Sequence, residues 1–213
     1  MRMRAKKNRN KRLECVTDFF VKYNDEKIDV SATFGTEKKR LLLEIGCGKG
    51  KFATALSKKF ADSNIIAVEK VPDVLLMAME KAKIEECSGL AFANFDAANI
   101  DVVLDEKSVD SLYLNFSDPW PRKKNAKRRL TSPIFLEKYK HILKDEAKIY
   151  FKTDNRALFD YSLETFEQNG YSVENVTFDL HSSSQNEDNI ETEYENNFAA
   201  KGFTINYLEA FLK

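Results

Sequence analysis

The chain has 213 residues, enough for one large α/β domain or for one domain with an extension. Hydrophobic residues make up 43% and charged residues 32%, which is typical of a globular protein with a heavily charged surface. Lys+Arg and Asp+Glu both number 34, so the formal net charge is zero, which excludes a uniformly basic nucleic-acid-binding protein and leaves only local basic patches.

Neither membrane insertion nor secretion is expected. The longest run without a charged residue, 87–95, is too short to cross a bilayer, and no apolar segment follows the basic first residues as a signal peptide would require. Cys15, Cys47 and Cys87 lack a Cys-x-x-Cys spacing, so neither a disulfide framework nor a metal site is expected. This cysteine usage is typical of the cytoplasm.

Residues 1–12 contain seven basic side chains and no acidic one. Such a segment is either a solvated terminus or an arm that lies on nucleic acid, and the sequence leaves both open. We expect 1–33 to form a basic N-terminal extension and 34–213 to form a single domain.

From residue 41 onward, short apolar runs alternate with helical patterns. Strands are predicted at 41–45, 65–68, 90–95, 111–116 and 147–152, and helices at 51–60, 73–86, 132–143 and 156–169. This alternation predicts a mainly parallel sheet with helices on both faces. Two β-like segments follow at 172–180 and 203–211, without a helix between them, and are predicted to pair antiparallel. The polar residues 181–197 are predicted to form a long surface loop.

A glycine loop connects the first predicted strand to the first helix. Gly46, Gly48 and Gly50 would allow a tight turn and a ligand lying against the backbone, although an ordinary strand–helix turn is the alternative. A dinucleotide fingerprint needs glycine at position 51, where this chain has Lys51. The loop therefore favours a nucleoside ligand without a pyrophosphate over NAD.

Acidic residues follow the next two strands. Glu69 comes after the second strand, where a carboxylate accepts hydrogen bonds from ribose hydroxyls. Asp96 follows the third strand and is a candidate for the adenine amino group. Taken singly, either residue is also compatible with a surface acid.

The segment 112–121 is the most specific in the chain. Its apolar strand ends at Asp118, and Pro119 and Pro121 stiffen the backbone around Trp120. Asp118 is therefore expected at the carboxyl edge of the sheet, where open α/β sheets bind ligands. The chain's only tryptophan would offer a flat face beside it, unless it is a core aromatic.

Six of the next eight residues are basic: Arg122, Lys123, Lys124, Lys127, Arg128 and Arg129. Beside a ligand site this run suggests a strip that binds phosphates, whereas by itself it would be a solvated loop.

These motifs together resemble the bacterial tRNA (guanine-N(7)-)-methyltransferases, which are class I S-adenosylmethionine-dependent enzymes. The resemblance covers residues 34–211 and includes Glu44-x-Gly46-x-Gly48-x-Gly50, 114–121, 127–131, 151–155 and 192–195 followed by Phe198 and Lys201-Gly202. It implies a Rossmann-like, doubly wound, seven-stranded and mostly parallel sheet with a reversed C-terminal hairpin strand.

The resemblance also assigns site residues. It implies that the methyl donor is bound by Glu44, Gly46, Gly48, Gly50, Glu69, Asp96 and Asp118, with Asp118 also catalytic. It implies that tRNA is bound by Arg122, Lys124, Lys127, Arg128, Arg129, Asp154, Thr192, Glu193, Tyr194 and Glu195. Two positions depart from the family pattern, since Arg122 replaces a common Lys and Asn125 replaces a frequent His.

The implied activity is methyl transfer from S-adenosylmethionine to N-7 of a guanosine in the tRNA variable loop. Guanine N-7 carries a lone pair and no proton, so no general base is needed, and Asp118 or Asp154 would offset the developing charge. The expected partner is tRNA, with no membrane, no obligatory protein partner and no metal, and the chain is expected to be a monomer or a homodimer. The alternatives are a non-catalytic RNA-binding protein and a nicotinamide-dependent oxidoreductase.

Overall fold

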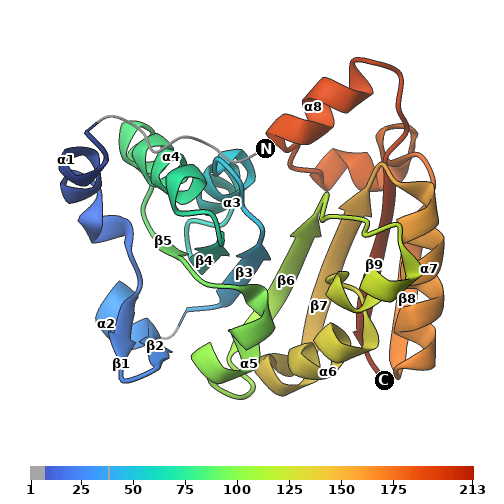
Figure 1. Ribbon diagram of the computed structural model, residues 1–213, viewed down its shortest axis with the longest axis horizontal. Helices are drawn as coiled ribbons and strands as arrows, with labels where there is room; N and C mark the ends of the chain where they lie inside the picture. The colour runs from blue at the N-terminus through green and yellow to red at the C-terminus, as the bar shows by residue number, and fades with distance from the viewer. Residues whose placement is uncertain (1–7, 38) are drawn as a thin grey trace.

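A computed structural model describes residues 8–37 and 39–213 (Figure 1). Its main sheet has seven strands in the order β5-β4-β3-β6-β7-β9-β8. All neighbours are parallel except β9, which runs antiparallel to both β7 and β8. The predicted fold class is therefore confirmed, including the reversed last strand.

The strands of this sheet are β3 Leu41–Ile45, β4 Asn64–Val68, β5 Leu90–Ala93, β6 Val109–Asn115, β7 Leu143–Thr153, β8 Tyr171–Thr177 and β9 Asn206–Leu212. The helices that follow them are α3 Lys51–Lys59, α4 Pro72–Ile84, α5 Ile100–Val103, α6 Pro133–Ile142, α7 Arg156–Gln168 and α8 Glu193–Ala199. The N-terminal elements are α1 Arg9–Glu14, β1 Lys22–Asn24, β2 Lys27–Asp29 and α2 Val30–Phe34.

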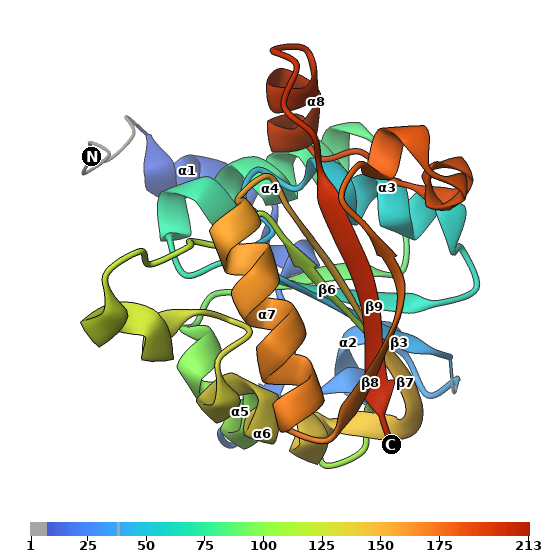
Figure 2. The ribbon, with the colours of Figure 1, turned by 90° about the vertical axis from the view of Figure 1, so that its right-hand side faces the viewer.

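Helices on both faces of the sheet bury two separate apolar cores (Figures 1 and 2). Because successive strand residues point to opposite faces, Leu41, Leu43 and Ile45 of β3 join the core beneath α6 and α7. Leu42 joins the other core, beneath α3 and α4. None of the helices within 8–37 and 39–213 has the length and apolar character needed to span a membrane.

The N-terminal segment packs against the sheet from residue 8 onward. Val21 and Ile28 are buried in the larger core, and Phe20 forms a parallel bridge with Phe92 of β5. Arg9 and Arg12 of α1 form ion pairs with α4, at Asp73 and Glu80 respectively. Of the basic arm 1–12, Arg2, Arg4, Lys6 and Lys7 lie outside the described residues, so its binding role stays a prediction, as does the boundary at residue 33.

The segment 181–197 differs from its prediction as a surface loop. It contains short 3₁₀ turns at Leu180–Ser182 and Ser184–Asp188 and the helix α8, so a helix does stand between β8 and β9. The Thr192 hydroxyl accepts a hydrogen bond from the Glu195 N–H, and the Glu195 side chain accepts one from the Thr192 N–H. This capping box starts a helix within a strongly polar stretch. The antiparallel pairing of β8 with β9 is confirmed.

Candidate active site

The carboxyl ends of five parallel strands place acidic residues along one edge of the sheet. This is the edge toward which the arrowheads of β6 and β7 point in Figure 1. Glu44 lies in β3, and Glu69, Asp96, Asp118 and Asp154 follow β4, β5, β6 and β7 in turn. Parallel strands of an open α/β sheet bind ligands at this edge.

A cavity of about 630 Å³ lies above β3, β4 and β5. Of the sequence-predicted site residues it is lined by Gly46, Glu69, Asp96, Asp118, Lys127 and Arg128. Its apolar walls come from Val68, Phe95, Leu130 and Phe135, and Trp120 lies on its boundary. One cavity therefore joins the predicted donor site to the predicted basic strip.

A smaller cavity of about 320 Å³ adjoins the first. Among the predicted residues it is lined by Glu44, Gly46, Gly48, Thr192, Glu193 and Tyr194. The two cavities share Gly46, Asn115 and Phe116, so they meet where β3 and β6 end. Gly50, Arg122, Lys124, Arg129, Asp154 and Glu195 line neither cavity among the residues that the structure describes.

The three loop glycines have different roles. Gly46 and Gly48 have positive φ angles of 83° and 56°, and a Cβ at either would meet no atom within 4 Å. That open space lies in the cavities, where a ligand can approach the backbone. A Cβ at Gly50 would lie 2.8 Å from the Ala78 Cβ of α4, so Gly50 allows the loop to pack against that helix.

Glu44 is a buried carboxylate with one satisfied oxygen. The Asn115 amide donates a hydrogen bond of 3.2 Å to its Oε1, while its Oε2 is buried with no hydrogen-bond partner in the described part of the chain. Burial raises the pKa of Glu44 to about 7, opposed by the Asn115 hydrogen bond and the charge of Lys152. An orphaned acceptor of this kind suits a cationic or hydrogen-bond-donating ligand group.

The side chains of Glu69 and Asp96 accept hydrogen bonds from backbone N–H groups of nearby loops. Glu69 accepts hydrogen bonds from the backbone N–H of Val71 at 2.8 Å and of Gly48 at 3.3 Å. Asp96 accepts one from the Ala98 N–H at 3.0 Å. Since a carboxylate has about four acceptor positions, each keeps capacity for a ligand in the cavity that it lines.

The loop after β6 has a strained backbone and is held by hydrogen bonds from Arg129. Phe116 and Trp120 have φ angles of 50° and 40°, which are unusual for bulky residues and concentrate at functional sites. The Arg129 guanidinium donates to the carbonyls of Pro119 at 2.9 Å and Trp120 at 3.2 Å. Asp118, within this loop, is exposed, and no group in the described chain hydrogen-bonds to its carboxylate. The loop thus places at the larger cavity a carboxylate that has no hydrogen-bond partner within the described chain.

The predicted basic strip forms a 3₁₀ turn, Lys123–Arg128. Arg122, Lys124, Lys127 and Arg128 are exposed, whereas Arg129 is half-buried, with its guanidinium 4.2 Å from the Tyr161 ring centroid. The Arg128 guanidinium lies 4.7 Å from the ring centroid of Trp120. The tryptophan therefore lines the cavity, as the prediction of a rim position expected, and the structure adds that a basic residue stacks on it.

The helix α8 brings its N-terminal residues to the smaller cavity. Tyr194 packs on Phe116 with ring centroids 5.0 Å apart, and its hydroxyl donates to Asp154 at 3.4 Å. Glu193 forms an ion pair of 2.9 Å with Lys49 of the glycine loop. Thr192 and Glu195 are buried, and Glu195 is paired with Lys152 of β7.

Two residues that support this site were not among the predicted site residues. Asn115 lines both cavities and holds Glu44, and a polar residue at the end of an apolar strand was the available signal. Lys152 is a charged residue inside the apolar run 149–153, a pattern that indicates a buried partner. Within the described ranges, no cluster of three His, Cys, Asp or Glu side chains fits a metal ion, and the three cysteines are free.

Comparisons with known proteins identify the family. A family model described as "Putative methyltransferase" matches residues 38–208. The tRNA (guanine-N(7)-)-methyltransferase of Listeria monocytogenes serotype 4b (strain F2365) is 40% identical, covering 99% of this chain and 98% of that protein. The enzyme of the same name from Lachnoclostridium phytofermentans is 47% identical over 79% of each chain. The chain belongs to the tRNA (guanine-N(7)-)-methyltransferase family.

Solved structures give the same fold at lower sequence similarity. The 16S rRNA methyltransferase KamB superposes with a TM-score of 0.63 at 12% identity, covering 82% of this chain and 88% of that one. At that identity the likeness concerns the fold alone. This member of the tRNA (guanine-N(7)-)-methyltransferase family thus has the Rossmann-like methyltransferase architecture.

Proposed function

We propose that the protein transfers a methyl group from S-adenosylmethionine to N-7 of a guanosine in the variable loop of tRNA. The observation that carries the proposal is the larger cavity, whose lining includes both Glu69 and Asp96 and the group Trp120, Lys127 and Arg128. Carboxylates that suit a nucleoside and basic side chains that suit phosphates, within one cavity, fit an enzyme that brings a small donor to a large RNA.

The residues present fit the donor. Gly46 and Gly48 leave open backbone for it, and the orphaned Glu44 Oε2 suits its α-ammonium group. The remaining acceptor positions of Glu69 suit the ribose hydroxyls, and those of Asp96 suit the adenine amino group. Gly50 acts indirectly, because it lets the loop pack on α4.

The chemistry requires positioning and charge rather than proton removal. When bound, S-adenosylmethionine supplies a methyl group already activated by its sulfonium. Guanine N-7 has a free lone pair, so the chain's residues need only hold the base in line and offset the positive charge that the purine acquires. Asp118 is the principal candidate for that role, because its carboxylate is unoccupied at the larger cavity. Asp154 is the second candidate, held by Tyr194.

The tRNA is assigned to the surface around both cavities. Arg122, Lys124, Lys127 and Arg128 are exposed and suit phosphate contacts. Glu193 and Tyr194 line the smaller cavity and suit contacts to an exposed guanosine, and the Thr192 hydroxyl, which lines it too, suits donation of a hydrogen bond there. Arg129 supports the strip by holding the loop around Asp118. The same proposal includes a cytoplasmic enzyme, monomeric or homodimeric, without an obligatory protein partner.

The proposal is tested by incubating the protein with isotopically labelled donor and unmodified tRNA, followed by nucleoside analysis. We expect label in 7-methylguanosine from the variable loop. RNA binding without donor binding would favour the non-catalytic RNA-binding alternative, and NAD binding in place of S-adenosylmethionine would favour the oxidoreductase.

A further inference from the structure

A buried ion pair connects β7 to the helix that borders the smaller cavity. Lys152 Nζ lies 2.5 Å from Glu195 Oε2, and the two side chains are 5% and 0% exposed. They are 43 residues apart in the sequence and come from a strand and from α8. Neither lines either of the two cavities assigned to donor and substrate, among the residues that the structure describes.

Every hydrogen-bonding position of this pair is used. The three N–H groups of the Lys152 ammonium donate to Glu195 Oε2, to the Ile190 carbonyl at 2.7 Å and to Asn189 Oδ1 at 2.9 Å. The Glu195 carboxylate accepts four hydrogen bonds, from Lys152, the Thr192 N–H, Asn189 Nδ2 and His181 Nε2. Since an ionised carboxylate only accepts, the last contact requires the His181 proton on Nε2. Glu195 therefore has no position left for a ligand.

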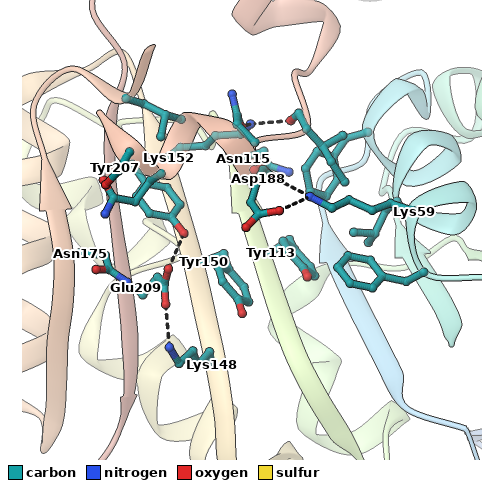
Figure 3. A pocket seen from close by; sticks show the side chains of 18 residues that line it. Lys59, Tyr113, Asn115, Lys148, Tyr150, Lys152, Asn175, Asp188, Tyr207 and Glu209 are labelled. Carbon is teal, nitrogen blue, oxygen red and sulfur yellow. Dashed lines mark hydrogen bonds and ion pairs between the residues drawn. The ribbon is translucent and has the colours of Figure 1, made fainter. Parts of the chain in front are cut away.

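The segment that this pair holds has few buried side chains of its own. Between residues 181 and 200, the only buried residues are Thr192 and Glu195, both polar. Part of this segment borders a third cavity, of about 590 Å³, whose lining combines Tyr113, Tyr150 and Tyr207 with apolar side chains such as Leu56 and Ile190 (Figure 3). Exposed ion pairs also join the segment to Lys59 and Lys49, and Tyr194 packs on Phe116, so the network around Lys152 is the buried one among these contacts.

The same lysine also touches the opposite side of the site. The Lys152 carbonyl accepts the Phe116 N–H at 2.9 Å, where the loop that carries Asp118 begins. Its side chain reaches α8, whose Tyr194 packs back on Phe116. Lys152 therefore stands between the strained loop after β6 and the helix that faces it.

We propose that Lys152 and Glu195 are a positioning pair, which holds α8 in place so that Glu193 and Tyr194 face the donor and guanine site. The inference rests on the proposed methyl transfer but gives Glu195 a different role from that implied by the family resemblance, since it supports the site from behind and touches no substrate. Removing one partner leaves a buried charge unpaired, so each single change releases α8.

The test is a double-mutant cycle with Lys152→Met, Glu195→Gln and the double variant, measuring kcat/KM for tRNA methylation and thermal unfolding. We expect each single variant to lose about 100-fold or more in kcat/KM, and the double variant to lose no more than the worse single. If Glu195 instead contacts substrate by itself, the losses multiply. Glu195→Gln preserves the size of the side chain. If Lys152→Met fails to fold, the activity and thermal unfolding of Glu195→Gln are compared with those of the wild type instead.

Hydrogen exchange of the unliganded protein separates this inference from the methyl-transfer proposal. We expect faster exchange of backbone amides in 189–199 in both single variants, with β3 and β4 unchanged. Lys148→Met is the matched control, because Lys148 lies on the same strand and pairs with Glu174 and Glu209, and it should leave exchange in 189–199 and activity near wild type. Unchanged exchange in 189–199 in the Lys152→Met protein would overturn the inference, whether or not the wild type methylates tRNA.

Discussion

The two halves of the sheet organise the site by different means. In the donor half, every residue of β3, β4 and β5 is buried, and α3 and α4 cover one face with an apolar core. In the other half, β6 and β7 are only partly buried, and polar networks hold α8 over their ends. Apolar packing makes the donor side of the site rigid. The RNA-facing side depends instead on a few charged contacts.

The largest expected effect lies in the donor half. Gly48→Val should abolish S-adenosylmethionine binding, because a branched side chain would fill the open space beside the loop. Isothermal calorimetry on the folded variant measures this. Gly170→Val is the control, since Gly170 also has a positive φ, of 84°, and open surroundings but lines neither cavity, so it imposes backbone strain alone. Wild-type donor affinity in the Gly48→Val protein would place the donor elsewhere.

Asp118→Asn tests the electrostatic role of the loop between the two halves. The change keeps the size of the side chain but removes its charge, so we expect the single-turnover rate to fall about 10² to 10³-fold at saturating tRNA and donor. Donor and tRNA affinities should stay near wild type. A preserved rate with weakened donor binding would make Asp118 a binding residue instead. If the rate and both affinities stay at wild-type values, Asp154 becomes the candidate for offsetting the charge on the purine.

Glu44→Gln tests the buried carboxylate of the donor half, and the quantity measured is the free energy of unfolding as a function of pH. Because the pKa of Glu44 rises to about 7 on folding, the unliganded wild type is most stable below the ordinary carboxyl pKa and loses stability as the pH rises through 7. Glutamine keeps an acceptor for Asn115 without the charge, so the variant should be more stable at pH 8, by at most about 3 kcal/mol. Urea unfolding at pH 5 and pH 8 measures the difference. Parallel pH dependences would contradict the raised pKa.

The smallest effect is expected from the basic strip. Replacing Lys124, Lys127 and Arg128 by Ala should weaken tRNA binding and reduce the log–log salt slope by about 0.7 to 0.9 for each phosphate that the protein no longer neutralises. Donor binding should be unaffected. Lys140→Ala/Lys144→Ala, at the opposite edge of the sheet, is the control. An unchanged slope would show that the strip is a solvated surface that does not bind tRNA.

Arg129→Ala should act differently from the changes in the strip. It should slow methyl transfer more than it weakens tRNA binding, because Arg129 holds the loop around Asp118.

Local patterns were sufficient to predict most of the sheet. The apolar run 41–45 matches β3 residue for residue, and the glycine loop and the Asp118 loop lie at the predicted edge. The start of β7 was missed, because the polar residues 144–146 interrupt the apolar pattern where the pairing of β6 with β7 is irregular. The capping box of α8 was visible in the sequence, but its polar surroundings favoured a loop.

The interactions that complete the site depend on contacts between distant segments. Lys152 finds Glu195, and Asn115 finds Glu44, only once the strands are assembled. The orphaned oxygen of Glu44 and its raised pKa likewise depend on three-dimensional burial. Motif reasoning therefore named many of the residues at the site but not the polar network that connects α8 to β7.

Methyl transfer to guanine N-7 can be tested by removing that atom from the substrate. Ligated tRNAs would carry a single 7-deazaguanosine, which has C–H in place of N-7, at each variable-loop guanosine in turn. We expect methyl transfer to disappear for one of these tRNAs and to persist for the others, while binding to all of them remains measurable. Full methylation of every deaza-substituted tRNA would contradict the account, because the acceptor would then be a different atom or a different nucleotide.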